Sequence, residues 1–388
     1  MPPPTSALTL VTGFWSPKAL DRPTVRSEAI YLHLFSELVR RVNFPMIVLI
    51  EPRLEEAVTA IVEKEKQKRP NVKVRPTPLA DVPYVTDREE RFGALVPPHN
   101  VVREKDTIGF SRLTWAKPEL VRRVAEEDPF GTTHFGWIDF GVAHVAEIGA
   151  RVNWSDVEAE STSTDKVRIC ERMATAKSET DDAGYFYAYN SARVCGGFFT
   201  GTAESLRRLA TVFDAELERM AEAWRFVLEE QVLAALTARH PDLFELWYAD
   251  YFGLFTNVKT VQRDVATVLA NLAHSRKFEL WENGRSITRQ LLDAMIRGGL
   301  RLEPDECVEL IDDGLACARH KDLPLAKRLA LIISALGKYS GTMHSMLRTR
   351  RDRTRSIEAT LTSLEQHVPW TWEEFIAQPD AHAWLSCL

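Results

Sequence analysis

The sequence has few cysteines, and no two of them lie close enough together to form a short metal-binding or redox motif. Its 388 residues include five cysteines, at positions 170, 195, 307, 317 and 387. The odd number and the wide spacing argue against both a disulfide framework and a zinc knuckle. This usage is typical of a reducing compartment, so we expect a cytoplasmic protein.

Long hydrophobic runs are also missing. The longest apolar stretches, such as 46–50 and 329–336, are too short to cross a bilayer. The N-terminal sequence MPPPTSALTLVTGF lacks the basic region that opens a signal peptide. We therefore expect neither secretion nor an integral membrane segment.

Neither sign of charge dominates. The chain carries 49 basic and 55 acidic residues, for a net charge of -6, so no overall positive field recruits nucleic acid or an anionic membrane. The one local exception is the run RTRRDRTR, in which Arg348, Arg351 and Arg355 share a helix face. Such a face either docks phosphate groups or is simply solvated. Because no aromatic residues interleave with the arginines, we do not expect a nucleic-acid partner.

Short apolar runs alternate with amphipathic helical patterns through the first two-thirds of the chain. This order predicts an α/β fold of Rossmann type, with a mixed, mostly parallel sheet flanked by helices. After residue 258 the strand signals stop, which predicts a first domain over 1–258 and a mostly helical C-terminal module over 259–388. The expected strands are 7–12, 44–50, 72–74, 134–138, 166–173, 185–189 and 194–199; the expected helices are 27–42, 54–68, 117–127 and a long helical stretch over 205–238.

A single acid, Asp139, ends the apolar strand pattern HFGWI of residues 134–138. A buried carboxylate is costly unless something pairs with it. It follows an interior strand, and open α/β sheets bind ligands at the carboxyl ends of their strands. Two interpretations stay open: a protein partner, or a metal ion with the phosphates that it carries. The Pro-rich stretch 76–109 is similarly either a surface loop or a loop beside a ligand.

Two more motifs have chemical uses. Gly196 and Gly197, in CGGFFTGT, have no side chain, so the backbone there either approaches a ligand closely or forms a bulge. The pair Glu229–Glu230 lies within the helical run 205–238. Adjacent glutamates on a helix are usually surface residues, but a buried one is a candidate general base.

In chain order, the motifs LTLVTGF, KPELVRRVAEEDPFGTTHFGWIDFG, CGGFFTGT, EEQVLAALTARHPDLFELWYADY and FTN resemble the bacterial HtrL/YibB-type (WlaTC-like) glycosyltransferase family of the GT-A nucleotide-diphospho-sugar transferase superfamily. The resemblance extends to Asn257 and leaves the C-terminal helices unexplained. It implies a GT-A-like fold and transfer of a sugar from a nucleotide-diphosphate donor to a hydroxyl acceptor. That acceptor is a glycan, a lipopolysaccharide-type intermediate or a small metabolite.

The resemblance also implies roles for single residues. Asp139 matches the acid of a Trp-(Ile/Val)-Asp-x-Gly motif and would hold Mn²⁺ or Mg²⁺ together with the donor diphosphate. Many GT-A enzymes have a second acid two residues away, which this sequence lacks. The missing ligand is then the diphosphate with water, or a distant residue: His144, Asp156 or Asp250. A metal-free site, with Lys117 or Arg112 facing the phosphates, is the alternative.

The remaining implied roles concern donor and acceptor. Thr12 and Gly13 would contact the base or ribose, Gly196 and Gly197 would border the donor sugar, and Glu230 or Asp250 would be the general base if the reaction inverts. Retention is equally compatible with the sequence. A different class of function is a degenerate GT-A fold that serves as a binding or scaffold protein through its helical module.

Overall fold

The computed structural model describes residues 6–16, 26–65, 71–86, 107–172, 177–188, 190–249 and 251–260, with position 92, residues 95–99, position 175 and scattered positions between 268 and 317. Contacts divide the chain into two units, Met1–Arg263 and Asp264–Leu388. In the second unit the described positions are helical, while the rest of the predicted helical module, its arginine cluster included, lies outside the described residues. The predicted boundary after residue 258 stays a prediction.

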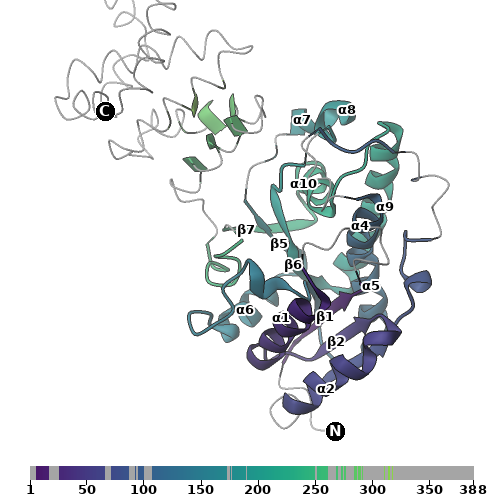
Figure 1. The fold of residues 1–388 in the computed structure, drawn as a ribbon. Coiled ribbons are helices and arrows are strands. Elements are labelled where there is room, and N and C mark those ends of the chain that lie inside the picture. The colour runs from purple at the N-terminus through teal and green to yellow at the C-terminus, as the bar shows by residue number, and fades with distance from the viewer. Residues whose placement is uncertain are drawn as a thin grey trace, which may run out of the picture. The chain divides into compact units, whose positions relative to one another are not determined.

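A seven-stranded sheet forms the centre of the first unit (Figure 1). Its strand order is β3-β2-β1-β4-β6-β5-β7. Its β6 is antiparallel to both neighbours, β4 and β5, and the other neighbouring strands pair in parallel. The strands are β1 (Leu8–Phe14), β2 (Met46–Ile50), β3 (Val72–Pro76), β4 (His134–Ile138), β5 (Val167–Glu171), β6 (Val194–Thr202) and β7 (Phe244–Tyr248).

Helices cover both faces of this sheet because its central strands are apolar on both sides. Every residue of β2 and β4 is buried, as expected for parallel strands between two helical layers. The α-helices of the first unit are α1 (Glu28–Arg41), α2 (Glu55–Glu65), α4 (Ile108–Trp115), α5 (Lys117–Glu127), α6 (Trp154–Ser161), α7 (Lys177–Asp181), α8 (Ala183–Phe186), α9 (Ala203–Glu222) and α10 (Glu229–Arg239).

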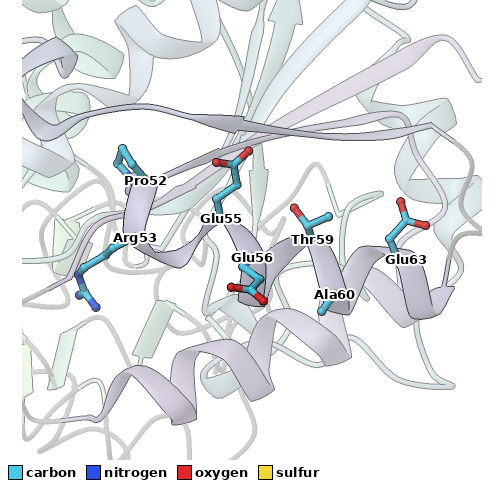
Figure 2. Close-up of a pocket in the computed structure, with 7 residues that line it drawn as sticks. All are labelled: Pro52, Arg53, Glu55, Glu56, Thr59, Ala60 and Glu63. Carbon is cyan, nitrogen blue, oxygen red and sulfur yellow. The ribbon is translucent and has the colours of Figure 1, made fainter.

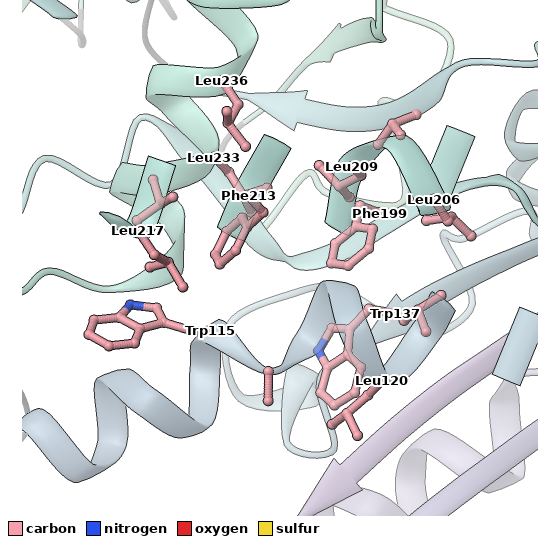
Figure 3. Close-up of a cluster of buried hydrophobic side chains, with 14 of the residues drawn as sticks. Trp115, Leu120, Trp137, Phe199, Leu206, Leu209, Phe213, Leu217, Leu233 and Leu236 are labelled. Atoms are coloured by element: carbon pink, nitrogen blue, oxygen red, sulfur yellow. The ribbon is translucent and has the colours of Figure 1, made fainter. Parts of the chain in front are cut away.

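Two hydrophobic clusters lie on opposite faces of the sheet. One joins Val11, Trp137 and Phe199 to side chains of α4, α5, α9 and α10, and Figure 3 shows its aromatic centre. The other joins Leu10, Val48 and Phe198 to α1, α2 and α6. The predicted fold class, a mixed and mostly parallel sheet flanked by helices, is therefore confirmed for this unit. None of the helices that the structure describes is long and apolar enough to cross a membrane.

Two local predictions were wrong, and one strand was not predicted. Residues 185–189 were expected as a strand, but α8 covers part of this stretch, because the Asp182 side chain caps the turn by accepting from the Tyr185 amide. The helical stretch 205–238 is two helices, α9 and α10, separated by a connection that contains Trp224 at a φ of 57°. The strand β7 had no predicted counterpart, although its sequence FELWY is rich in aromatic β-formers.

Trp115 anchors one hydrophobic cluster and gives a test of this packing. It is fully buried, and its indole N–H donates to the Val227 carbonyl at 2.8 Å. We expect Trp115→Ala to lower the free energy of unfolding by about 3–5 kcal/mol in chemical denaturation. Trp224→Ala is the matched control: this tryptophan is 66% exposed, so its loss should change stability by less than about 0.5 kcal/mol. Equal effects of the two substitutions would contradict the packing described.

Candidate functional site: a lysine between carboxylates

Four segments converge at the edge of the sheet where the parallel strands end. Asp139 directly follows β4, and β6 begins beside it because that strand is antiparallel, with Ile138 opposite Phe198. Lys117 is the first residue of α5, and Glu229 and Glu230 open α10. The fold thereby gathers carboxylates and one ammonium group at the edge where open α/β sheets bind ligands.

Asp139 has two partners within the protein. Its Oδ1 accepts a hydrogen bond from the Trp137 indole N–H at 2.6 Å and lies 2.8 Å from Lys117 Nζ. The Asp139 side chain remains 40% exposed. The backbone amide of Asp139 donates to the Gly197 carbonyl at 2.9 Å. The carboxylate is thus paired inside the protein and still accessible to a ligand.

The Lys117 ammonium connects β6 and the end of β4 to the start of α10. Its Nζ donates to the Gly196 carbonyl at 3.2 Å and to Glu229 Oε1, and it pairs with Asp139 as described above. The ammonium also lies 5.8 Å from the centroid of the Trp137 ring. Burial alone would lower the pKa of Lys117, but the Asp139 and Glu229 carboxylates raise that pKa well above its ordinary value. Lys117 therefore stays charged, and its three protons are directed at three protein oxygens.

Glu230 lies beside this ion cluster and is partly buried. Its Oε1 accepts from the Gly196 amide at 3.1 Å and from the Tyr251 hydroxyl. Burial, followed by the negative charge of Glu229, raises the pKa of Glu230 to about 7; the Tyr251 hydrogen bond and Lys117 oppose that rise. Both of these partners bond Oε1, and no contact among the described residues uses Oε2. Glu230 thus has the geometry and the pKa of a general base.

Gly196 and Gly197 lie where acidic side chains from other segments come close to the backbone of β6. A Cβ on Gly196 would come within 2.8 Å of Glu229 Oε1 and 2.9 Å of Glu230 Cγ, and one on Gly197 would come within 3.2 Å of Asp139 Oδ2. The pairing of β6 with β5 also shifts register here, which marks a bulge. The structure shows the bulge, and the groups that approach the backbone are the protein's own carboxylates. Close approach to a ligand stays a prediction.

Thr12 and Gly13 lie near the end of β1 and are packed among side chains. Thr12 is fully buried, and its hydroxyl has no hydrogen-bond partner among the described residues. A Cβ on Gly13 would lie 2.6 Å from the Trp15 ring and 3.3 Å from the Trp137 ring, so the glycine makes room for the indole that binds Asp139. Their predicted contacts with base or ribose stay predictions.

The other candidate ligands lie apart from the cluster or outside the described residues. His144 Nδ1 bonds the Gly141 carbonyl at 2.6 Å, and Asp156 pairs with Lys259 at 2.8 Å. The buried Arg112 reaches the Val85 carbonyl at 3.4 Å. Asp250 falls outside the described residues, so its predicted role as base or metal ligand stays a prediction.

The oxygens beside Asp139 are occupied by Lys117, so they do not at the same time hold a divalent ion. The Lys117 ammonium already lies against Asp139 Oδ1, Glu229 Oε1 and the Gly196 carbonyl, an all-oxygen set of the kind that Mg²⁺, Ca²⁺ or Mn²⁺ prefers. Within the described part of the chain, no three His, Cys, Asp or Glu side chains gather as a metal site. Asp139 Oδ2 is the oxygen of that carboxylate that the cluster does not use.

Sequence reasoning missed two residues of this cluster, Glu229 and Tyr251. Glu229 was visible only as one of two adjacent glutamates, and nothing local shows that it faces Lys117 rather than solvent. Tyr251 is 21 positions from its partner Glu230, so no local pattern connects them. The neighbouring Gln231 is structural: its amide holds Ser191 and the Phe186 carbonyl.

A hollow of about 580 Å³ lies elsewhere, along α2 and the turn before it (Figure 2). It is lined by Pro52, Arg53, Glu55, Glu56, Thr59, Ala60 and Glu63. These side chains all come from one surface segment, and none belongs to the cluster at Asp139. We assign the chemistry to the cluster, where buried ionisable groups converge, and not to this open surface.

Comparison with known proteins agrees with the motif analysis. Residues 100–260 match a family model described as "Bacterial protein of unknown function (HtrL_YibB)". The resemblance to the HtrL/YibB family is confirmed. The matched HtrL/YibB segment contains Lys117, Asp139, Glu229, Glu230 and Tyr251, the five side chains of the cluster. The family description assigns no activity to any of them.

Among solved structures, the chain is similar to the crystal structure of mouse Xyloside xylosyltransferase 1 in its apo form. The identity is 12% and the TM-score 0.38; the match covers 62% of this chain and 84% of the mouse chain. At that score we draw no argument from it. No curated protein matches the chain in sequence.

The glycine packing gives a test of the cluster. We expect Gly196→Ala to displace Glu229 and Glu230 and to lower the free energy of unfolding by about 1–3 kcal/mol, because the added methyl has no space. Gly184→Ala is the matched control. Its added methyl would meet Asp182 Oδ1 at 3.4 Å, an ordinary contact, and should change stability by less than about 1 kcal/mol. Urea denaturation of both variants measures this, and a Gly196→Ala variant as stable as the control would refute the tight approach.

Proposed function

We propose that the chain is a glycosyltransferase that moves a sugar from a nucleotide-diphosphate donor to a hydroxyl acceptor. The observation that carries the proposal is the placement of Glu230: a partly buried carboxylate with a pKa of about 7 lies next to Glu229, whose partner Lys117 also pairs with the partly exposed Asp139 at the end of β4. The ordered HtrL/YibB motifs support the same reaction class.

Glu230 is assigned the role of general base in an inverting transfer. Its free Oε2 takes the proton of the acceptor hydroxyl while that oxygen forms a bond to the anomeric carbon of the donor sugar. The bond from this carbon to the donor phosphate breaks, and the nucleoside diphosphate leaves with the electron pair. A base whose pKa lies near the working pH suits this step. Asp250 stays the rival base, and retention the rival outcome.

The donor would lie over the bulge of β6. Gly196 and Gly197 would border the donor sugar, Asp139 would face its diphosphate end, and Thr12 and Gly13 would lie toward the nucleoside. The expected Mn²⁺ or Mg²⁺ would enter the site bound to the donor diphosphate. Lys117 already occupies the protein oxygens that could otherwise hold an ion. The acceptor class, the cytoplasmic location and the absence of a nucleic-acid partner stay predictions from the sequence.

The pKa of Glu230 predicts two pH dependences. The folded chain keeps the Glu230 proton up to about pH 7, whereas a glutamate ordinarily releases it near 4.5. The contribution of Glu230 to the free energy of unfolding is therefore present at low pH and is lost as the pH rises through about 7. Between pH 5 and 8 the wild type should lose about 1–3 kcal/mol relative to Glu230→Gln. Parallel stability curves for the two proteins would contradict the raised pKa.

Activity should rise with pH through about 7, because the base must be ionised. Tyr251→Phe should move this rise to higher pH, since the Tyr251 hydrogen bond lowers the pKa of Glu230. A pH profile of kcat/KM measures both effects. A Tyr251→Phe enzyme that is slower at every pH, with the same midpoint, would show that the tyrosine has only a packing role.

Donor binding can be tested without knowing the acceptor. We expect one class of UDP-, GDP-, CDP- or dTDP-sugar to raise the melting temperature of the full chain by mass action. Asp139→Asn should reduce that shift, and Gly184→Ala should leave it unchanged. The same panel, run with Mn²⁺, Mg²⁺ or chelator, tells whether an ion accompanies the donor. No stabilisation by any donor would overturn the transferase proposal and favour the scaffold role.

A further inference from the structure

The Lys117 ammonium is surrounded by protein oxygens in the way that a bound metal ion would be. Two carboxylate oxygens and one backbone carbonyl surround its Nζ, and they come from three separate segments: the end of β4, the start of α10 and the bulge of β6. Lys117 and Glu229 are both buried. A charge in such a place is stable only with close and well-directed partners.

We propose that Lys117 is the resident cation of this site, and that its ammonium occupies the position which a divalent ion would otherwise take between Asp139, Glu229 and Gly196. The inference deepens the proposed function, because it concerns the same site, but it makes a claim about metal chemistry that does not depend on sugar transfer. An ion that reaches the site with a donor diphosphate would have to bind Oδ2 of Asp139, the carboxylate oxygen that the cluster does not use.

Three observations carry this inference. First, the three protons of the ammonium match three protein oxygens, so Lys117 has no donor left for a phosphate. Second, Asp139 Oδ1 is further occupied by the Trp137 indole N–H. Third, one ammonium faces two carboxylates, so the cluster keeps a surplus negative charge. The lysine thereby holds the ion cluster together and leaves the base next to an uncompensated carboxylate.

The geometry predicts what happens when the lysine is shortened. Lys117→Ala leaves two carboxylates and a carbonyl around an empty position, which are ligands that suit Mn²⁺. We expect Mn²⁺ alone, without nucleotide, to bind the full-length Lys117→Ala chain at least tenfold more tightly than the wild type. Mn²⁺ should also raise the melting temperature of this variant and leave that of the wild type nearly unchanged. Electron paramagnetic resonance of free Mn²⁺ and thermal unfolding measure the two effects.

Controls separate the site from other acidic surfaces. Lys117→Ala/Glu229→Gln removes one ligand and should lose the gain in Mn²⁺ binding, whereas Lys117→Ala with Glu56→Gln, on the distant α2, should keep it. If Lys117→Ala folds only with Mn²⁺ present, that dependence is itself the expected result.

The wild type gives a second test that needs no destabilised variant. Mn²⁺ binding by the wild type should be the same before and after Asp139→Asn. The inference is overturned if the wild type binds Mn²⁺ as tightly as Lys117→Ala and loses that binding in Asp139→Asn. A folded Lys117→Ala chain that gains no Mn²⁺ binding also overturns it. Either result leaves the donor panel unaffected, so the failure of this inference is distinguishable from the failure of the transferase proposal.

Discussion

The ion cluster around Lys117 is the constraint on which the candidate site depends. Buried charges are tolerated only when they are paired and hydrogen-bonded, and this ammonium is held by oxygens from β4, β6 and α10. The same contacts fix the relative positions of Asp139, Glu229 and the bulge of β6. Through the bulge they also position Glu230, whose carboxylate accepts from the Gly196 amide.

The two glycines show how backbone and charge depend on each other. Regular strand geometry would place ordinary side chains at positions 196 and 197, but the carboxylates of Glu229 and Asp139 fill that space from different segments. The local bulge and the lack of side chains together let acids from α10 and β4 approach one strand.

Under the proposed function, the arrangement suits acid–base chemistry on a hydroxyl group better than the binding of a free anion. The described cluster contains one ammonium and three carboxyl groups, so a bare diphosphate would meet repulsion unless a counter-ion came with it. A neutral acceptor hydroxyl beside Glu230 meets no such barrier. Asp139 and Glu230 differ because Asp139 is paired with Lys117, whereas the raised pKa of Glu230, about 7, lets it take up and release a proton near neutral pH.

The sequence by itself determined the alternation of strands and helices, the placement of Asp139 at a strand end and the family motifs, because hydrophobic periodicity and local spacing carry those signals. It also identified Lys117, Gly196, Gly197 and Glu230 as candidates, though for contacts with a ligand. Only the tertiary structure decided that Lys117 pairs with Asp139 and Glu229, and that Tyr251 bonds Glu230. These partners are 21 to 112 positions apart in the chain, and burial, which makes their pairing obligatory, arises only when the sheet and its helices pack together.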